Sequence, residues 1–271
     1  MALIADPMAP SVMGIVNVTP DSFFAAARTQ ARERAIARGI ELFALGCDIV
    51  DVGGESTRPG ARDVALDEKL ERVLSVVAAL APHGPVSIDT RKPEVARAAV
   101  GAGATVINDV SGGLVDLAGE LGTGYVAMHS QGTPQTMQVA PHYDDVVAEV
   151  LDALDAMAAH ARAMGVGQLW LDPGIGFGKS AEHNLALVAH CGDLVELARR
   201  HGAGVLVGTS RKRFLATLGP TALEVDERLE GSIATEAWAL MSGAAMIRVH
   251  DAAAAVQLRE LLSRPVAEVG P

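Results

Sequence analysis

The sequence predicts a single (β/α)8 TIM barrel of the α/β class, with an active site at the carboxyl ends of its strands. Eight short apolar segments are spaced along the chain, and polar, glycine or charged residues follow each one. A strand buried on both faces shows such a continuous apolar run, whereas a half-exposed strand alternates. Polar residues gathered at equivalent strand ends are typical of a parallel barrel whose active site lies on one rim.

The apolar segments and the stretches between them define the elements in order. The expected strands are 12–18, 48–54, 86–90, 106–111, 125–129, 169–174, 205–210 and 246–251. Apolar residues recur at helical spacing over 66–81 and 144–164, and Pro93 favours a helix start just after the third strand. Further helices are expected over 30–45, 93–102, 181–200, 226–243 and 252–263.

The alternation of strands and helices continues without a long linker or a change in composition. One domain is therefore expected over residues 1–271, with an ordered core over about 11–263. The longer connections, 19–29, 55–65 and 130–143, contain few core-forming residues, which is typical of loops on the rim of a barrel.

The charge balance limits the partners of the chain. It carries 22 Lys and Arg against 33 Asp and Glu, a formal net charge of −11. This balance argues against nucleic acid or an anionic membrane as a partner. Basic residues nevertheless cluster at 211–213, and Arg248 lies within an apolar run. A positive pocket on an acidic protein indicates a small anionic ligand.

Cysteine usage and the distribution of apolar residues indicate a compartment. Cys47 and Cys191 stand singly, with no C-x-x-C spacing, which favours a reduced, cytoplasmic chain. The first residues include an early acid and no basic region before an apolar core, so no signal peptide is expected. No stretch approaches the ~20 consecutive apolar residues that a membrane span needs.

Asp89, Asn108 and Asp172 are the most informative polar residues, because each ends an apolar strand. Any one of them alone is more often a helix cap or a loop hydrogen bonder than a ligand contact. Three at equivalent strand ends favour a ligand, because so much polar surface is costly without a partner. Two carboxylates and an amide suit a flat heterocycle with an amino group and ring N–H donors, and Lys212 can donate to its opposite edge.

The last two strands end in an anion-binding set. Ser210 ends the seventh expected strand, and Arg248 and His250 lie near the end of the eighth, where barrels of this kind commonly bind phosphate. A helix expected to start near Ser210 adds N–H groups and the positive end of its dipole. Arg248 lies inside a buried run and needs an anionic partner, whereas Arg213 is expected on a solvated helix face.

The segment PGIGFGKS at 173–180 is not a P-loop, because Pro173 occupies the position of the first glycine of that motif. Its glycines instead let the backbone approach a ligand closely. His129 and His250 lack the spacing of a zinc site, so no structural metal is expected. Mg²⁺ carried in by a phosphorylated substrate stays open.

Motifs from one end of the chain to the other resemble those of the dihydropteroate synthases of the folate pathway. They are MGIVNVTPDSF (13–23), DVGGESTRPGA (51–61), SIDTRKPEVAR (87–97), INDVSGG (107–113), MHSQGTPQTMQ (128–138), LDPGIGFGKS (171–180), GTSRKRF (208–214) and IRVHD (247–251). The resemblance implies a (β/α)8 fold, usually homodimeric, that joins 4-aminobenzoate to 6-hydroxymethyl-7,8-dihydropterin diphosphate. Pyrophosphate is released, often with Mg²⁺ as cofactor, and sulfonamides compete at the aminobenzoate site.

The resemblance also implies a role for each matching residue. The pterin would be held by Asp89, Asn108, Asp172 and Lys212, in a pocket lined by Met128 and Phe177. The diphosphate would be held by Asn17, Arg248 and His250, with Asn17 acting by way of Mg²⁺. The second loop would supply a wall of Thr57, Arg58 and Pro59, and Ser210 would contact the aminobenzoate carboxylate. The residues implied as catalytic are Arg58, Lys212, Arg248 and His250.

The first loop departs from the family pattern. Family members commonly read DSFSDGG there, whereas this chain reads DSFFAAA at 21–27, so Ala25 stands where an aspartate is expected. This difference keeps a catalytically impaired pterin-binding paralogue as an alternative. A second alternative is a pterin-dependent methyltransferase acting with a corrinoid partner, which STRPG (56–60) and RVH (248–250) disfavour because such a protein needs no diphosphate site.

Overall fold

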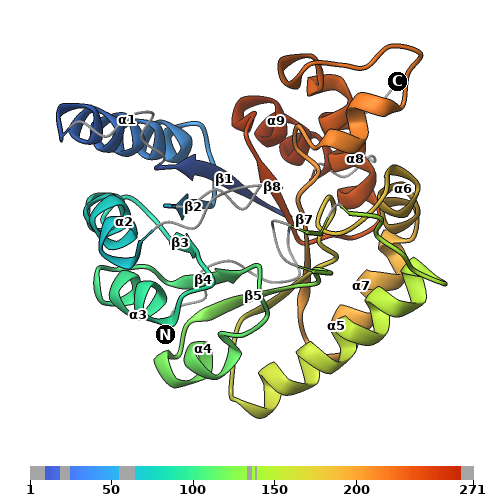
Figure 1. Cartoon of the computed structure of the whole chain (residues 1–271), viewed down its shortest axis with the longest axis horizontal. Helices are drawn as coiled ribbons and strands as arrows, with labels where there is room; N and C mark the ends of the chain where they lie inside the picture. The colour runs from blue at the N-terminus through green and yellow to red at the C-terminus, as the bar shows by residue number, and fades with distance from the viewer. Residues whose placement is uncertain (1–9, 19–24, 55–64, 133–135, 138, 264–271) are drawn as a thin grey trace.

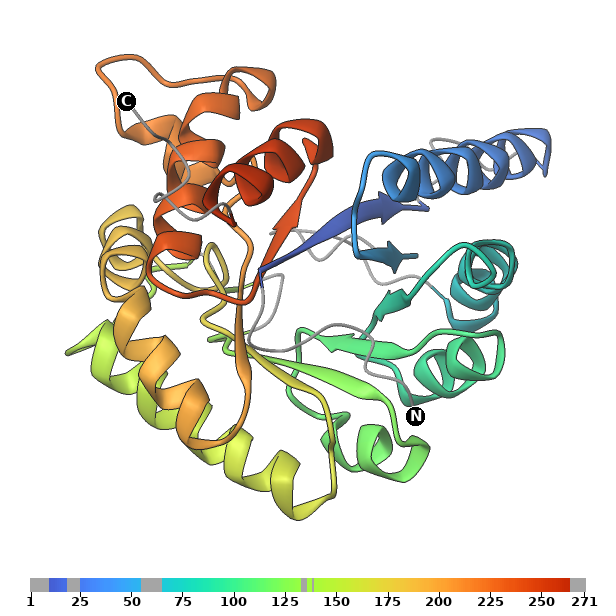
Figure 2. The same cartoon turned by 180° about the vertical axis from the view of Figure 1, so that it is seen from behind.

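The computed structural model describes residues 10–18, 25–54, 65–132, 136–137 and 139–263, and the side chains of 25–29 are not among those described. Eight parallel strands hydrogen-bond in chain order and close into a barrel. The helices lie outside this ring of strands in both views of the molecule (Figure 1, Figure 2). The predicted (β/α)8 barrel is confirmed.

Every expected strand is present and buried almost throughout. The strands are β1 Ser11–Asn17, β2 Ile49–Gly53, β3 Val86–Asp89, β4 Val106–Asp109, β5 Gly124–Met128, β6 Leu169–Asp172, β7 Gly204–Val207 and β8 Met246–Val249. Each ends one to three residues before the expected boundary, and the residues beyond these ends belong to the rim loops.

The helices that follow the strands form the outer layer. They are α1 Ala25–Ala44, α2 Leu66–Leu80, α3 Pro93–Gly101, α4 Val115–Leu121, α5 Val146–Ala163, α6 Ala181–Ala189, α7 Cys191–Arg200, α8 Leu229–Met241 and α9 Ala252–Leu262. Pro93 stands at the start of α3 as predicted. The Asp145 side chain caps α5 by accepting hydrogen bonds from the backbone N–H groups of Val147 and Ala148.

One helix was not assigned a range from the sequence, and two expectations for the helices were wrong. The sequence analysis did not foresee α4, whose 7 residues are too short to show a helical period. The single helix expected over 181–200 is two helices, α6 and α7, separated at His190. No α-helix starts near Ser210: a short 3₁₀-helix, η1 Arg213–Thr217, begins three residues later, after Arg211 has taken a left-handed conformation with φ 56°.

Apolar side chains fill the barrel in two clusters. The inner cluster is Met13, Ile49, Val106, Val126, Trp170, Leu206, Ala245 and Met246. A larger cluster occupies the space between the strands and the helices and consists mainly of Val, Leu, Ala and Ile. The inner cluster fills the barrel below the polar strand ends, so ligands can reach those ends only from the rim.

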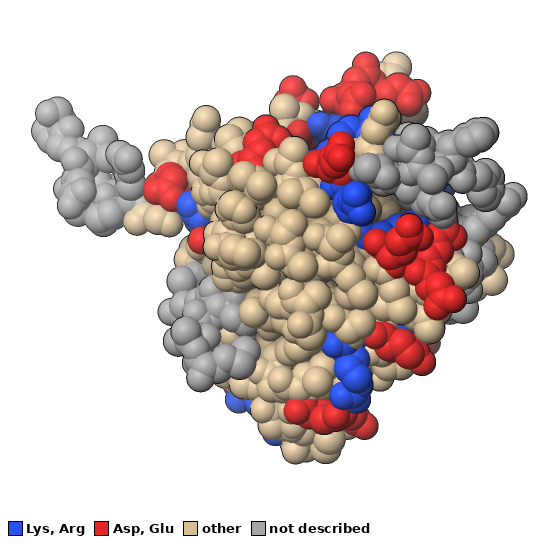
Figure 3. Space-filling model, turned by 90° about the vertical axis from the view of Figure 1, so that its left-hand side faces the viewer, with Lys and Arg blue, Asp and Glu red and all other residues tan. Residues whose placement is uncertain are grey.

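The surface carries charges of both signs. On the face in Figure 3, the basic side chains of the described residues lie next to acidic ones rather than in a block of their own. Within the described ranges, no helix is both long enough and apolar enough to cross a bilayer.

Candidate active site

The register of the sheet places the predicted polar residues side by side. Asn17 pairs with Gly53, Gly53 with Asp89, and Asp89 with Asn108, across four consecutive strands. A side chain at position 53 would begin 3.6 Å from Asn17 Oδ1 and 3.7 Å from Asp89 Cβ. Glycine therefore leaves open the space between the amide of Asn17 and the carboxylate of Asp89.

Arg248 joins two buried carboxylates inside the mouth of the barrel. Its Nε donates to Asp51 Oδ2 at 2.7 Å, and an Nη donates to Asp89 Oδ2 at 3.1 Å. Asn108 Nδ2 donates to the same Asp51 oxygen at 3.0 Å. Asp51 is fully buried and Asp89 is 5% exposed. The expectation that Arg248 needs an anionic partner is met, and in this structure the partners are carboxylates of the protein itself.

Asp51 was given no role from the sequence, although it stands near the carboxyl end of an apolar run. It lies inside β2, two residues before the strand ends. A carboxylate in the middle of the apolar run DIVDVGG was the available signal, because a buried charge needs a partner. Arg248, in the apolar run of β8, is that partner.

The two carboxylates keep hydrogen-bonding capacity that no described residue uses. Asp51 Oδ1 and Asp89 Oδ1 are buried and have no partner among the described residues. Burial raises the pKa of Asp89 to about 7, the guanidinium of Arg248 opposes this shift, and the neighbouring Asp51 adds to it. Unsatisfied acceptors of this kind are costly unless a ligand supplies the missing donors.

Asp172 ends β6 and lies 7% exposed on the far side of the mouth from β2 and β3. Its Oδ1 accepts a hydrogen bond of 2.7 Å from the N–H of Gly174, which fixes the carboxylate at the strand end. Burial raises the pKa of Asp172, and the Gly174 hydrogen bond and the charge of Lys212 oppose that shift. Met128 pairs with Asp172 in the register and is buried.

Lys212 and Phe177 meet at the same place. The Lys212 ammonium stands 4.2 Å from the centroid of the Phe177 ring, a cation–π arrangement. The structure thus brings together Asp172, Lys212 and Phe177, the residues for which the family resemblance implies a role at the pterin. An aromatic face, a cation and a carboxylate suit a flat ring that carries both donors and acceptors.

Lys179 is a second residue that the sequence analysis passed over, since it was considered only within the rejected P-loop. The side chain is 3% exposed, and its Nζ lies 3.0 Å from His129 Nδ1 and 3.1 Å from the Phe177 carbonyl oxygen. Burial lowers the pKa of Lys179 to about 7 and that of His129 to about 4. This pair fastens the β6–α6 loop to the end of β5.

Ser210 and His250 come together at the ends of β7 and β8. The Ser210 hydroxyl accepts a hydrogen bond of 3.1 Å from the His250 backbone N–H and lies 3.3 Å from His250 Nδ1. The expected helix dipole at Ser210 is absent, as described above. Arg213 is exposed, as predicted.

Of the remaining predicted site residues, one is described by the structure and three are not. Asn17 is exposed at the end of β1. Thr57, Arg58 and Pro59 lie outside the described residues, as does the side chain of Ala25. No group of three or more His, Cys, Asp or Glu side chains that would hold a metal occurs within the described ranges.

The chain resembles known proteins over nearly its whole length. Residues 13–250 match the family described as pterin binding enzyme. The dihydropteroate synthase of Escherichia coli (strain K12) is 43% identical over 253 residues, which cover 89% of this chain and 86% of that protein.

Solved structures of dihydropteroate synthases share the fold. The dihydropteroate synthase of Xanthomonas albilineans with 4-aminobenzoic acid superimposes with a TM-score of 0.85 at 43% identity, covering 98% of this chain and 95% of that one. The enzyme of Burkholderia cenocepacia complexed with 7,8-dihydropteroate gives a TM-score of 0.79 at 41% identity, covering 93% and 90%.

Proposed function

The chain belongs to the pterin binding enzyme family, and from this premise we propose that it catalyses the dihydropteroate synthase reaction. It is a transferase that joins 4-aminobenzoate to 6-hydroxymethyl-7,8-dihydropterin diphosphate and releases pyrophosphate. The observation that supports this proposal most is that buried carboxylates and cations share one barrel mouth. Arg248 Nη2 lies 3.1 Å from Asp89 Oδ2. The Lys212 ammonium lies over the Phe177 ring, and its charge acts on Asp172. The whole chain is taken to act as one barrel domain.

The pterin ring fits the buried carboxylates of Asp89 and Asp172. Asp89 Oδ1 and the remaining oxygen of Asp172 accept from the amino group and ring N–H groups, and the Asn108 amide adds a further polar contact. Lys212 donates to the ring carbonyl or a ring nitrogen, while Met128 and Phe177 cover the ring faces. The buried, partnerless Asp89 Oδ1 supports this role, because a ring donor would satisfy it.

The diphosphate is assigned to the cations at the last strand. Arg248 and His250 donate to its oxygens, and Arg58, Thr57 and Pro59 are proposed to close the site from the second loop. Ser210 is proposed to contact the aminobenzoate carboxylate, since its hydroxyl lies beside His250 at the same rim. Sulfonamides are expected to compete with 4-aminobenzoate for that position.

Mg²⁺ fits the donor set at the mouth. The Asn17 oxygen lies near the open space above Gly53, and Mg²⁺ is commonly held by one or two protein oxygens, several waters and substrate phosphates. Asn17 would therefore hold the ion only together with the diphosphate. When bound, the ion would neutralise charge that develops on the departing pyrophosphate.

The protein's task in the reaction is electrostatic. The exocyclic C–O bond breaks, which leaves positive charge on the pterin methylene carbon and negative charge on pyrophosphate. Arg248 and His250 stabilise the anion, and the buried carboxylates of Asp89 and Asp172 stabilise the cation. The neutral amine of 4-aminobenzoate bonds to the methylene carbon and loses its proton to water, so positioning rather than a dedicated base supplies the rest.

A second copy of the chain is the proposed partner. α8 presents Trp238 and Met241, which are 55% and 76% exposed and lie three residues apart on one helix face. Large exposed apolar side chains on one face favour an interface, and a two-fold dimer is the commonest form. Sedimentation equilibrium should show a dimer that Trp238→Glu dissociates, and a monomer at every concentration would contradict the dimer.

The state of the two cysteines supports a cytoplasmic location, which we propose for this protein. Cys47 and Cys191 are both buried and free, and burial raises the pKa of each thiol to about 11. Unreactive single thiols suit a reducing compartment.

Pyrophosphate release tests the function directly. Purified protein with Mg²⁺ is expected to release one pyrophosphate per dihydropteroate formed, and only when both substrates are present. Ligand binding without release would favour the impaired paralogue. Tight binding of methyl-tetrahydrofolate with no diphosphate dependence would favour the methyltransferase, a reading that the synthase relatives do not support.

A further inference from the structure

Arg211 stands between two proposed site residues, Ser210 and Lys212, in an unusual backbone conformation. Its φ of 56° is in the left-handed region, and among the described residues only one other non-glycine residue, Ala140, has a positive φ. Side chains other than glycine, asparagine and aspartate rarely adopt this region, and they do so where the surroundings fix them.

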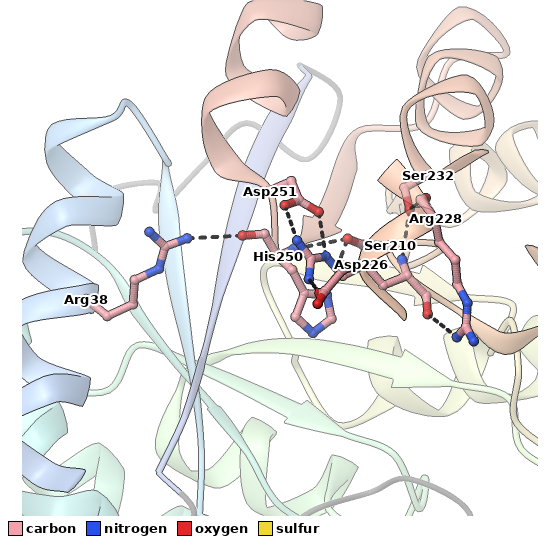
Figure 4. A network of polar contacts seen from close by, with 8 residues as sticks. Arg38, Ser210, Asp226, Arg228, Ser232, His250 and Asp251 are labelled. Carbon is pink, nitrogen blue, oxygen red and sulfur yellow. Dashed lines mark hydrogen bonds and ion pairs between the residues drawn. The ribbon is translucent and has the colours of Figure 1, made fainter. Parts of the chain in front are cut away.

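Both backbone groups of Arg211 are fixed by the start of α8. Its N–H donates to Ser232 Oγ at 2.9 Å, and its carbonyl oxygen accepts from Arg228 Nη1 at 3.2 Å. Ser232, which is 1% exposed, also donates to the Arg228 carbonyl at 2.6 Å, so the two anchors hold each other. Figure 4 shows Arg228 and Ser232 on the α8 side of this network.

The side chain of Arg211 joins β7 to the residues after β8. Nε and an Nη donate to the two oxygens of Asp251 at 2.9 and 2.7 Å, and the other Nη donates to Asp226 Oδ1 at 2.8 Å. Two parallel bonds to one carboxylate fix direction as well as distance. The Arg211 guanidinium holds the pKa of Asp251 below its usual range, so the pair is ionised at neutral pH.

His250 is held from both sides in the same network (Figure 4). Its N–H donates to Ser210 Oγ at 3.1 Å, and its carbonyl oxygen accepts from Arg38 Nη2 of α1 at 3.1 Å. Asp251, the next residue, carries the carboxylate that forms the ion pair with Arg211. The ends of β7 and β8 are thus joined twice, through Ser210–His250 and through Arg211–Asp251.

We propose that Arg211 is a positioning residue, which through Asp251 and α8 sets where Ser210, Lys212 and His250 stand relative to one another. This inference deepens the proposed function and rests on it. Arg211 acts without touching substrate, because all three nitrogens of its guanidinium donate to Asp251 and Asp226, whereas only Nε and Nη2 of Arg248 donate to carboxylates. Since Lys212 serves the ring and His250 the leaving group, a shift between β7 and β8 would misalign the two halves of the substrate.

Arg211→Gly distinguishes the effect of the Arg211 side chain from the effect of its backbone conformation. Glycine adopts φ 56° without strain, so this variant keeps the turn and loses the ion pairs. Asp251→Asn is the second variant, since it keeps Arg211 and removes the charge that it grips. Arg97→Ala is the matched control, because Arg97 makes a comparable two-bond pair with Glu120, at 2.8 and 2.9 Å, on α3 and α4 away from the mouth.

Steady-state kinetics distinguish positioning from general support. In Arg211→Gly and in Asp251→Asn, kcat is expected to fall at least tenfold while KM for the pterin diphosphate changes less than threefold. Arg211→Lys should recover part of kcat, and combining Arg211→Gly with Asp251→Asn should add no further loss. Arg97→Ala should match the wild type. Multiplicative losses, or a kcat no lower than in the control, would overturn the proposal.

Hydrogen exchange gives a readout independent of turnover. Arg211→Gly should speed amide exchange in residues 208–214 and 249–252, while exchange in β2–β5 stays as in the wild type. Unchanged exchange at β7 and β8 would contradict the positioning role even if the wild type made no product. If the wild type forms no product but Arg211→Gly still exchanges faster at these residues, the result contradicts the proposed function and leaves the positioning role standing.

Discussion

Replacing Arg248 with methionine removes the only guanidinium that contacts both Asp51 and Asp89 among the described residues. The two carboxylates stay inside the barrel, where Asp51 is fully buried and Asp89 is 5% exposed. Removing one partner of a buried ion pair leaves an uncompensated charge and typically costs about 3–5 kcal/mol. Arg248→Met should therefore lose about that much unfolding free energy at pH 8.

The loss should depend on pH. Asp89 has a folded-state pKa of about 7, above its ordinary value of 3.8, so the stability that its protonated form contributes is present below pH 4 and is lost as pH rises through 7. Arg248 is the main influence that lowers this pKa, so in the variant the pKa rises further. The two proteins should differ least near pH 5.5, where Asp89 is protonated in both, and most above pH 8.

Urea unfolding at pH 5.5 and pH 8.5 measures both effects. Asp51→Asn in the Arg248→Met background should restore part of the lost free energy, because it removes one of the stranded charges. Arg97→Ala, which breaks an exposed pair, is the control and should show little change at either pH. An Arg248→Met protein as stable as the wild type at pH 8.5 would refute the reasoning.

Three further predictions follow from other buried groups. Burial and the charge of Asp251 raise the pKa of Glu236 to about 8, so the wild type should lose stability relative to Glu236→Gln as pH rises from 4.5 through 8. That loss should be on the order of 5 kcal/mol by urea unfolding, and parallel pH profiles would contradict it. Gly174 has φ 67°, and a Cβ there would overlap the His129 carbonyl, so Gly174→Ala should lower the unfolding free energy by about 3 kcal/mol or more. Gly165 has φ 78° and open space around it, so Gly165→Ala should lower it by only about 1–2 kcal/mol. Equal costs would contradict the packing argument. Asp172→Asn should weaken binding of the dihydropterin ring without its diphosphate at least tenfold by calorimetry, and an unchanged affinity would remove Asp172 from the ring site.

Much of the fold was predictable because burial on both faces leaves a simple signal. Each of the eight apolar runs became a strand, since helices cover the outer side of the barrel. α4 was missed because its 7 residues complete about two turns, too few for periodicity to show. The break at His190 was missed because both flanking segments keep an apolar face, with Leu187 and Leu194 buried.

The candidate site was predictable where chemistry coincides with a strand end. Asp89, Asn108 and Asp172 follow apolar runs, and the structure places them at the mouth. The partners of the buried charges were not predictable, because contacts such as Arg248 with Asp51 join residues 197 positions apart. Lys179 was passed over for a similar reason: its contact with His129 spans 50 positions and depends on how the β6–α6 loop folds back.

A crystal structure of the protein with 6-hydroxymethyl-7,8-dihydropterin diphosphate would test the central claim most directly. The ring is expected against Asp89, Asn108 and Asp172, with the diphosphate directed to Arg248 and His250 in the same mouth. A ring bound elsewhere, or a diphosphate directed away from β8, would contradict the account.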